Sequence, residues 1–178
     1  MEEETTDFVP GYRIRRVSDR DVLRVGEIAQ LAWVRVHDSF RKIVGDAMHD
    51  TLWPDWEEQK DADVRRHCEQ YPDWSRVVET VETDHVVEFI TFRVDEKKGM
   101  GIIGNNAVHP EHQGRGIATA MYAHVLDLFR RDGLRYACVG TGLDEGHTPA
   151  RRAYEKAGFD IALPAVTYYN VPLTRSRR

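Results

Sequence analysis

Apolar residues change their spacing along the chain, from the alternation of a strand to the three-and-four spacing of a helix. Residues 12–17 alternate enough to form a strand. Ser18 then stands at an N-cap position, with Asp21 three residues on. The helix that follows carries its apolar side chains on one face, namely Val22, Val25, Ile28, Ala29, Ala32 and Val36. Residues 45–70 favour helix with a break near Pro54, because proline disfavours helix in the preceding residue.

The middle of the chain predicts an antiparallel meander of three strands, at 76–81, 86–95 and 101–108. A broad apolar stripe then predicts a helix from about 115 to 131, which Gly133 ends. A strand at 134–139, a helix at 149–157 and a final strand pair around 159–173 complete the order. This order predicts a mixed α/β domain in which a helical crossover joins parallel neighbours.

Length and charge narrow the functions open to this chain. Its 178 residues suit one domain at 10–174, between a flexible acidic lead at 1–9 and a flexible basic tail at 175–178. The net charge of −5 does not favour nucleic acid or an anionic membrane as partner, so any bound anion must be captured locally. No apolar run approaches the ~20 residues of a membrane span, and the acidic residues 1–7 lack the basic-then-apolar order of a secretory signal. We therefore expect a cytoplasmic protein with Cys68 and Cys138 as reduced thiols.

The run from Val108 to Thr119 is the most informative local feature. It passes from a strand into a helix through a turn that contains Gly114 and Gly116. Glycines let a backbone curl with its N–H groups inward, and the helix that follows adds the positive end of its dipole. The segment therefore predicts a nest for a phosphate or pyrophosphate.

Two segments resemble the motifs of the GNAT superfamily, the acyl-CoA-dependent N-acetyltransferases. Residues 113–118, Gln-Gly-Arg-Gly-Ile-Ala, resemble the Q/R-x-x-G-x-G/A signature, and residues 106–112 resemble the strand end before it. Residues 150–159 are similar to the A-x-x-x-Y-x-K-x-G-F pattern of the family's next helix. The resemblance implies a single GNAT-type domain, whose mixed sheet is split at the fourth strand with helices on both faces.

The resemblance also implies acetyl-CoA as co-substrate, with its pantetheine arm in the split between residues 106–109 and 137–140. A backbone N–H near Asn106 would polarise the thioester carbonyl, and Tyr154 matches the tyrosine that protonates the departing sulfur. His147 stands where relatives often carry an asparagine that touches the pantetheine, and it either replaces that donor or starts the helix. Arg115 either reaches a phosphate or stays solvated. The implied cofactor-binding residues are Ala107, Val108, His109, Gln113, Gly114, Arg115, Gly116, Ile117, Ala118, Thr119 and His147.

The reaction implied is direct acetyl transfer to an amine of a small molecule or peptide. An alkylamine with a pKa near ~10 must lose a proton first, yet residues 101–106 lack the carboxylate that many relatives use. The proton acceptor stays open between Glu88, His109, Asp144, His147, and a water held by Asn105 or Asn106. That missing carboxylate also keeps open a non-catalytic acyl-CoA sensor or assembly module.

Residues 30–60 and two later loops are expected to form the acceptor pocket. Trp33 and Asp38 are candidates for holding a cationic amine, and Glu88 is a third candidate contact. Trp53 and Trp56 fit better as seam-filling aromatic side chains. His109 and His112 flank Pro110 without a plausible third ligand, so no metal is expected. A homodimer through the last strands is a further expectation from the family.

Overall fold

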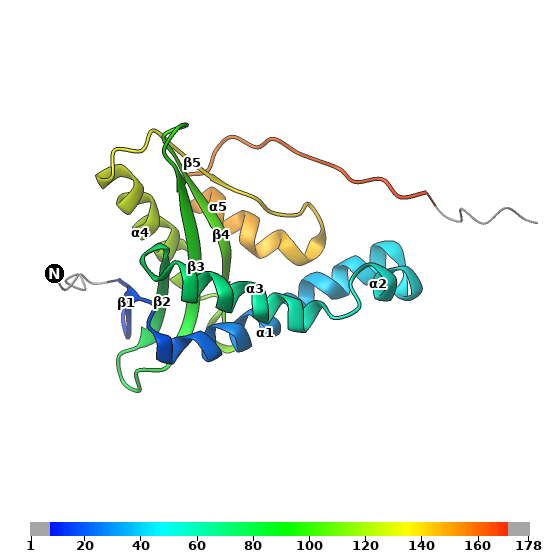
Figure 1. Ribbon diagram of the computed structural model, residues 1–178, viewed down its shortest axis with the longest axis horizontal. Helices are drawn as coiled ribbons and strands as arrows, with labels where there is room; N and C mark the ends of the chain where they lie inside the picture. Colours follow the sequence, from blue (N-terminus) through cyan, green and yellow to red (C-terminus); the bar gives the residue numbers. More distant parts are fainter. Residues whose placement is uncertain (1–7, 171–178) are drawn as a thin grey trace, which may run out of the picture.

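A five-stranded mixed sheet forms the centre of the computed structural model, which describes residues 8–170 (Figure 1). The strands lie side by side in chain order: β1 (Tyr12–Arg16), β2 (Ser75–Thr80), β3 (Val86–Asp95), β4 (Met100–Val108) and β5 (Tyr136–Val139). The pairs β1–β2, β2–β3 and β3–β4 are antiparallel, and β5 runs parallel to β4. This confirms the predicted meander and the helical crossover to a parallel strand.

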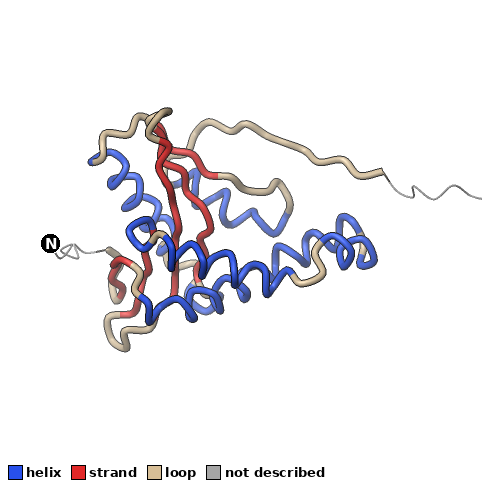
Figure 2. The backbone as a smooth tube through the Cα atoms, in the orientation of Figure 1, coloured by secondary structure: helices blue, strands red, loops and turns tan. Residues whose placement is uncertain are grey.

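Helices cover both faces of the sheet, as predicted (Figures 1 and 2). They are α1 (Val22–Val44), α2 (Asp46–Leu52), α3 (Trp56–Gln70), α4 (Ile117–Arg131) and α5 (Thr148–Lys156). One core joins α1 and α3 to the sheet through Ile28, Val64 and Phe89. The other joins α4 and α5 to the opposite face through residues such as Met121 and Ile90. The break between α2 and α3 falls at Trp53–Asp55, next to the proline that predicted it.

The sheet splits between β4 and β5. Only residues 100–103 of β4 pair with β5, whose partners are residues 136–139. Beyond this point β4 contains a bulge, because Ile90 pairs with Asn106 while Phe92 pairs with Ile103, so Thr91 faces two residues. The Thr91 hydroxyl donates to the Asn105 carbonyl at 3.0 Å and stabilises the bulge. The end of β4 therefore leaves one backbone edge unpaired.

The last predicted strand pair, around 159–173, is wrong over the residues that the structure describes. Residues 159–170 form neither helix nor strand, and residues 171–173 lie outside the described part. Ile161 and Leu163 are 92% and 96% exposed, so the apolar spacing finds no sheet to pack on. Pro164 also lacks the N–H that a strand would contribute. Apolar spacing alone does not make a strand without a partner edge.

Smaller differences lie at the element ends. α4 begins at Ile117 rather than near Arg115, because Gly116 has a positive φ of 82° and is the N-cap. Phe8, assigned to the flexible lead, packs against the core, whereas residues 1–7 and the tail 175–178 lie outside the described part. Cys68 and Cys138 are free thiols. None of the helices within residues 8–170 has the length and apolar character that a membrane span requires.

Candidate functional site

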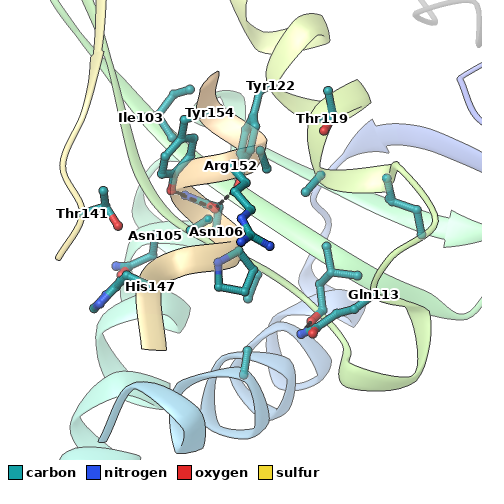
Figure 3. A pocket seen from close by; sticks show the side chains of 18 of the residues that line it. Ile103, Asn105, Asn106, Gln113, Thr119, Tyr122, Thr141, His147, Arg152 and Tyr154 are labelled. Atoms are coloured by element: carbon teal, nitrogen blue, oxygen red, sulfur yellow. Dashed lines mark hydrogen bonds between the residues drawn. The ribbon is translucent and has the colours of Figure 1, made fainter. Parts of the chain in front are cut away.

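A cavity of about 700 Å³ opens where β4 and β5 separate (Figure 3). The end of β4 forms one wall and α5 another, while the turn before α4 and part of α1 complete it. Twelve of the predicted site residues line it: Trp33, Asn106, Ala107, Val108, Gln113, Gly114, Gly116, Ile117, Ala118, Thr119, His147 and Tyr154. The split that the resemblance implied is therefore a concave site to which the two motifs both contribute.

The glycine turn presents free backbone donors to this cavity. Gly114 and Gly116 have φ values of 77° and 82°, a conformation that favours glycine. Within residues 8–170, no protein acceptor is found for the N–H groups of residues 114–119. The Gln113 N–H is different, because it donates to the Pro110 carbonyl at 3.3 Å. The anion nest therefore consists of the amides after Gln113, and the Gln113 amide does not belong to it.

The free edge of β4 supplies further backbone donors. His109 donates its N–H to the Val87 carbonyl, which sets the alternation of this antiparallel pair. Because hydrogen-bonded and non-hydrogen-bonded pairs alternate, the N–H groups of Asn106 and Val108 point away from β3 and toward the split. The Val108 carbonyl on that edge already accepts from the Gln113 side chain at 3.1 Å. The edge therefore offers the N–H groups of Asn106 and Val108 as donors.

The cavity is electropositive although the chain carries a net charge of −5. Among the described residues that line it, none is an aspartate or glutamate, whereas Arg35, Arg152 and Lys156 are cationic. Arg152 and Lys156 lie one turn apart on α5, on the face that also carries Pro149 and Ala153. A local concentration of positive charge of this kind suits a phosphate-bearing ligand.

Tyr154 belongs to a hydrogen-bonded group of three side chains. Its phenol oxygen lies 3.1 Å from the Asn106 amide nitrogen, and the Tyr122 hydroxyl donates to the Asn106 amide oxygen at 2.7 Å (Figure 3). The Asn106 nitrogen also donates to the Gly104 carbonyl at 3.0 Å. Because a carbonyl only accepts, the nitrogen must face Gly104 and Tyr154, and the oxygen must face Tyr122.

This arrangement decides where the Tyr154 proton can point. The Tyr122 hydroxyl donates to the Asn106 amide oxygen at 2.7 Å, whereas the Tyr154 hydroxyl donates to the same oxygen only at a long 3.4 Å. The Tyr154 O–H can exchange this long contact for a ligand atom in the cavity, while the Asn106 side-chain N–H donates to the phenol oxygen. Burial raises the pKa of Tyr154, although the hydrogen bonds with Asn106 and Tyr122 oppose that rise. The phenol thus holds its proton at neutral pH.

A second polar pair, Asp144 and His147, lies in the turn before α5. The His147 Nδ1 atom is 2.5 Å from an Asp144 carboxylate oxygen, and the Asp144 side chain is only 6% exposed. Burial by itself would raise the pKa of Asp144, but the hydrogen bonds from His147 and Ser39 lower it overall. His147 lines the cavity and Asp144 does not.

Four predicted site residues do not line the cavity: His109, Arg115, Asp38 and Glu88. The Arg115 guanidinium donates to the Tyr12 hydroxyl at 2.9 Å and to the Glu111 carbonyl at 3.1 Å. Asp38 is exposed on α1. Glu88 is 1% exposed, and burial raises its pKa well above the usual range. Because Glu88 is buried and does not line the cavity, it does not meet a ligand there.

The expected acceptor region contains a cation where the sequence suggested an anion. The Lys60 ammonium lies 4.4 Å from the centre of the Trp33 ring and donates to Asn105 at 3.1 Å. Trp53 and Trp56 pack among the helices, where Trp56 stacks on His37 at 3.9 Å between ring centres. These contacts agree with the packing interpretation of the two tryptophans. The seam they fill lies between helices rather than between helix and sheet.

Tyr122 and the two cations of α5 are not among the predicted site residues. Tyr122 lies within the apolar stripe of the helix predicted at 115–131, and only the fold shows that Asn106 lies beside its hydroxyl. Arg152 and Lys156 flank Tyr154 at helical spacing, a signal that could have placed them beside it. Within residues 8–170, no three His, Cys, Asp or Glu side chains are arranged to hold a metal ion.

Comparison with known structures supports the same fold. An acetyltransferase (GNAT family) from Bacillus anthracis superposes with a TM-score of 0.60 at 16% identity, over 89% of this chain and 82% of its own. The PaiA N-acetyltransferase from Thermoplasma acidophilum, in complex with coenzyme A, gives 0.66 at 13% identity, over 85% and 91%. A Salmonella typhimurium protein with its cofactor acetyl-CoA gives 0.57 at 17% identity, over 86% and 82%.

The family assignment comes from the sequence itself. No curated protein matches the chain, and the structural neighbours above are too distant in sequence to show more than the fold. Residues 45–159, well over half of the 178 residues, match the acetyltransferase (GNAT) family. This span includes the glycine turn, the split strand and the Tyr154 helix. The chain is therefore an acetyltransferase that belongs to the GNAT family.

Proposed function

We propose that this chain transfers an acetyl group directly from acetyl-CoA to a primary amine of a small molecule or peptide. The observation that carries the proposal is one cavity that combines the unpaired amides of residues 114–119 with the oriented phenol of Tyr154. Coenzyme A or acetyl-CoA accompanies two of the structural neighbours. Acetyl-CoA carries a diphosphate, which requires hydrogen-bond donors, and its sulfur leaves as a thiolate, which requires an acid.

The residues divide the binding of acetyl-CoA between them. The amides of the glycine turn would hold the pyrophosphate, with Arg152 and Lys156 adding positive charge from α5. The pantetheine arm would lie along the free edge of β4, with the N–H groups of Asn106 and Val108 as donors. The backbone N–H of Asn106 would then polarise the thioester carbonyl. Each role uses a group that has no competing protein acceptor.

The reaction requires two proton transfers in addition to bond exchange. The amine loses one proton before attack, and its nitrogen forms a bond to the acetyl carbon as the carbon–sulfur bond breaks. Tyr154 gives its proton to the departing sulfur, and the phenolate recovers a proton that the new amide nitrogen releases through water. The products are an N-acetylated amine and coenzyme A, with one proton released for each protonated amine consumed.

Calorimetric titration with acetyl-CoA tests the binding half of the proposal. Gly116→Glu places a carboxylate in the nest, and we expect the affinity to fall at least about tenfold through repulsion and lost amides. Gly133→Glu is the matched control, since Gly133 also has a positive φ, of 74°, but lies at the other end of α4. Equal losses in both variants would refute the nest.

A screen of amines tests the catalytic half. Release of free thiol from acetyl-CoA is measured with alkylamines, amino acids, aminoglycosides and peptides. Turnover with any amine that falls at least about 100-fold in Tyr154→Phe supports the enzyme. Tight binding of coenzyme A without turnover across the panel would favour a sensor or assembly module instead. The homodimer remains a prediction, which sedimentation of the full chain would test.

A further inference from the structure

The acceptor amine needs a base, and no carboxylate lines the described part of the cavity. We infer that His147, held by Asp144, is the catalytic base that takes the proton from the acceptor ammonium. The inference rests on the proposed acetyl transfer and adds to it the residue that the sequence left open. It stands on the geometry of the pair, the rigidity of its turn and its place in the cavity.

Asp144 fixes the tautomer of His147. A carboxylate only accepts hydrogen bonds, so the Nδ1 atom that lies 2.5 Å away carries a proton. In the neutral imidazole the other ring nitrogen, Nε2, is then an unprotonated acceptor. Within residues 8–170 it makes no hydrogen bond, and it is not sealed from solvent. In this state His147 accepts a proton, whereas an asparagine amide at the same place would donate one.

The turn that carries the pair is held rigidly. The Arg151 guanidinium donates to the carbonyls of Gly142 and Asp144 at 2.6 and 2.8 Å. Gly146 packs so closely on α1 that an added Cβ would lie 2.8 Å from the Cα of Val36. Because the backbone is fixed from both sides, the imidazole presents a fixed nitrogen to the cavity. Fixed geometry is what a general base requires.

Two of the other candidates are excluded by where they lie. Glu88 and His109 do not line the cavity. His112 does, but one of its ring nitrogens lies 3.0 Å from the Tyr12 hydroxyl, and the residue belongs to the turn before the glycines. In Figure 3, Gln113 from that turn and His147 lie on opposite sides of Asn106. A thioester at Asn106, with its phosphates at the glycine turn, would leave the His147 side for the acceptor.

Several charges surround His147. Asp144 contacts it directly, and the Arg151 guanidinium lies in the same turn. On the α1 side, Lys42 pairs with Glu145 at 3.3 Å, and Arg35 lines the same cavity. The Asp144 carboxylate contacts the ring that becomes positively charged when it takes the proton, so it is the counter-charge of that imidazolium. Replacing the carboxylate by an amide removes this counter-charge.

The step balances as follows. The Nε2 atom takes a proton from R–NH₃⁺, which leaves neutral R–NH₂ and a His147 imidazolium paired with Asp144. The amine then attacks the thioester carbon while Tyr154 protonates the sulfur. His147 returns its proton to water after product release. No oxidant, metal or further reactant is needed.

The test compares an acceptor that needs deprotonation with one that does not. The best alkylamine from the screen is protonated at pH 7.5, whereas hydroxylamine is already neutral. In His147→Gln we expect kcat to fall about 100-fold with the alkylamine and less than about threefold with hydroxylamine. His85→Gln, at an exposed histidine of the β2–β3 turn, is the matched control and should match the wild type. In Asp144→Asn we expect the same selectivity, with a loss of kcat for the alkylamine and little change for hydroxylamine.

Losses of equal size with both acceptors would overturn the inference and leave a merely structural turn. Should wild-type protein release no thiol with any amine, the proposed acetyl transfer itself fails, so the two failures are distinguishable. Nitrogen NMR of the wild-type ring is independent of turnover and of variant folding. In the neutral ring it should show a protonated Nδ1 and a bare Nε2, and the opposite tautomer would refute the assignment.

Discussion

The Tyr122 hydroxyl contacts Asn106, which in turn contacts the Tyr154 hydroxyl, so we expect Tyr122 to act through Tyr154. Tyr122→Phe removes only the Tyr122 hydroxyl oxygen. In the native protein the Tyr122 hydroxyl donates to the Asn106 amide oxygen at 2.7 Å, and the Tyr154 hydroxyl donates to the same oxygen only at a long 3.4 Å. Without the Tyr122 hydroxyl, the contact with Tyr154 can shorten, because its strong competitor for that oxygen is gone. We expect the proton to turn toward Asn106 and away from the departing sulfur.

The size of the effect follows from one hydrogen bond. A neutral hydrogen bond contributes about 0.5–1.5 kcal/mol net, and Tyr154 must break the new one before it can act. Since 1.4 kcal/mol is about a factor of ten, kcat should fall about three- to tenfold. Stability should fall by about 1 kcal/mol, because Tyr122 is only 3% exposed but its partner lines a cavity that water can reach. For a domain of this size that lowers the Tm by about 2–4 °C.

Steady-state kinetics of four proteins decide whether Tyr122 acts through Tyr154. The wild type, Tyr122→Phe, Tyr154→Phe and the double variant form a cycle. We expect the double variant to be no slower than Tyr154→Phe alone, with the KM for acetyl-CoA unchanged. Tyr136→Phe, at a tyrosine that is 61% exposed on β5, controls for the substitution. Multiplicative losses in kcat would refute the reasoning, because a general structural effect would add to the loss of the acid.

Three further predictions concern stability and reactivity. Burial would raise the pKa of Glu79, but hydrogen bonds from two arginines of β1 lower it overall. The stability that these ion pairs give the folded protein is therefore present above the unfolded pKa of Glu79, about 4.5. It is lost as the pH falls through the lower native pKa. Glu79→Gln should cost about 3 kcal/mol at pH 7 and much less at pH 3 in urea unfolding; equal costs would contradict this. Gly101→Ala should cost about 1–3 kcal/mol, because its Cβ would lie 2.3 Å from the Phe129 ring, whereas Gly140→Ala, with open space around it, should be neutral by thermal unfolding. Burial raises the pKa of the Cys68 thiol to about 11, so mass spectrometry should find it unalkylated by iodoacetamide at pH 8 until the protein unfolds; rapid native labelling would contradict this.

Much of the fold follows from local patterns, because most elements bury one face. The strand at Val86–Asp95 has the predicted bounds, and the helix break beside Pro54 falls where expected. The prediction is wrong where apolar spacing stood alone. Residues 159–170 carry apolar side chains at strand-like spacing, yet no strand forms there. A strand needs backbone partners as well as apolar side chains, and spacing within one segment does not reveal whether an edge is available.

The site was predictable to the extent that backbone geometry fixes it. The glycines at 114 and 116 identify a turn whose conformation nearly requires them, and the structure gives both a positive φ. Side-chain partners separated by long stretches of chain were not predictable. The contact between Asn106 and Tyr122 joins β4 to α4. The Arg115 side chain donates to Tyr12, which lies on the edge strand β1. Such pairs depend on the packing of two elements, which no motif records.

The amide at position 106 bears on why the base lies elsewhere in this chain. A carboxylate there would accept from both tyrosines, so it would hold the Tyr154 proton away from the sulfur, and it would leave the Gly104 carbonyl without its present donor. An acid that is oriented by an amide is thus incompatible with a carboxylate base at that point of β4. The proton acceptor must then come from another element. The Asp144–His147 pair, on the turn before the helix that carries Tyr154, places both proton-transfer groups on one continuous segment facing the split.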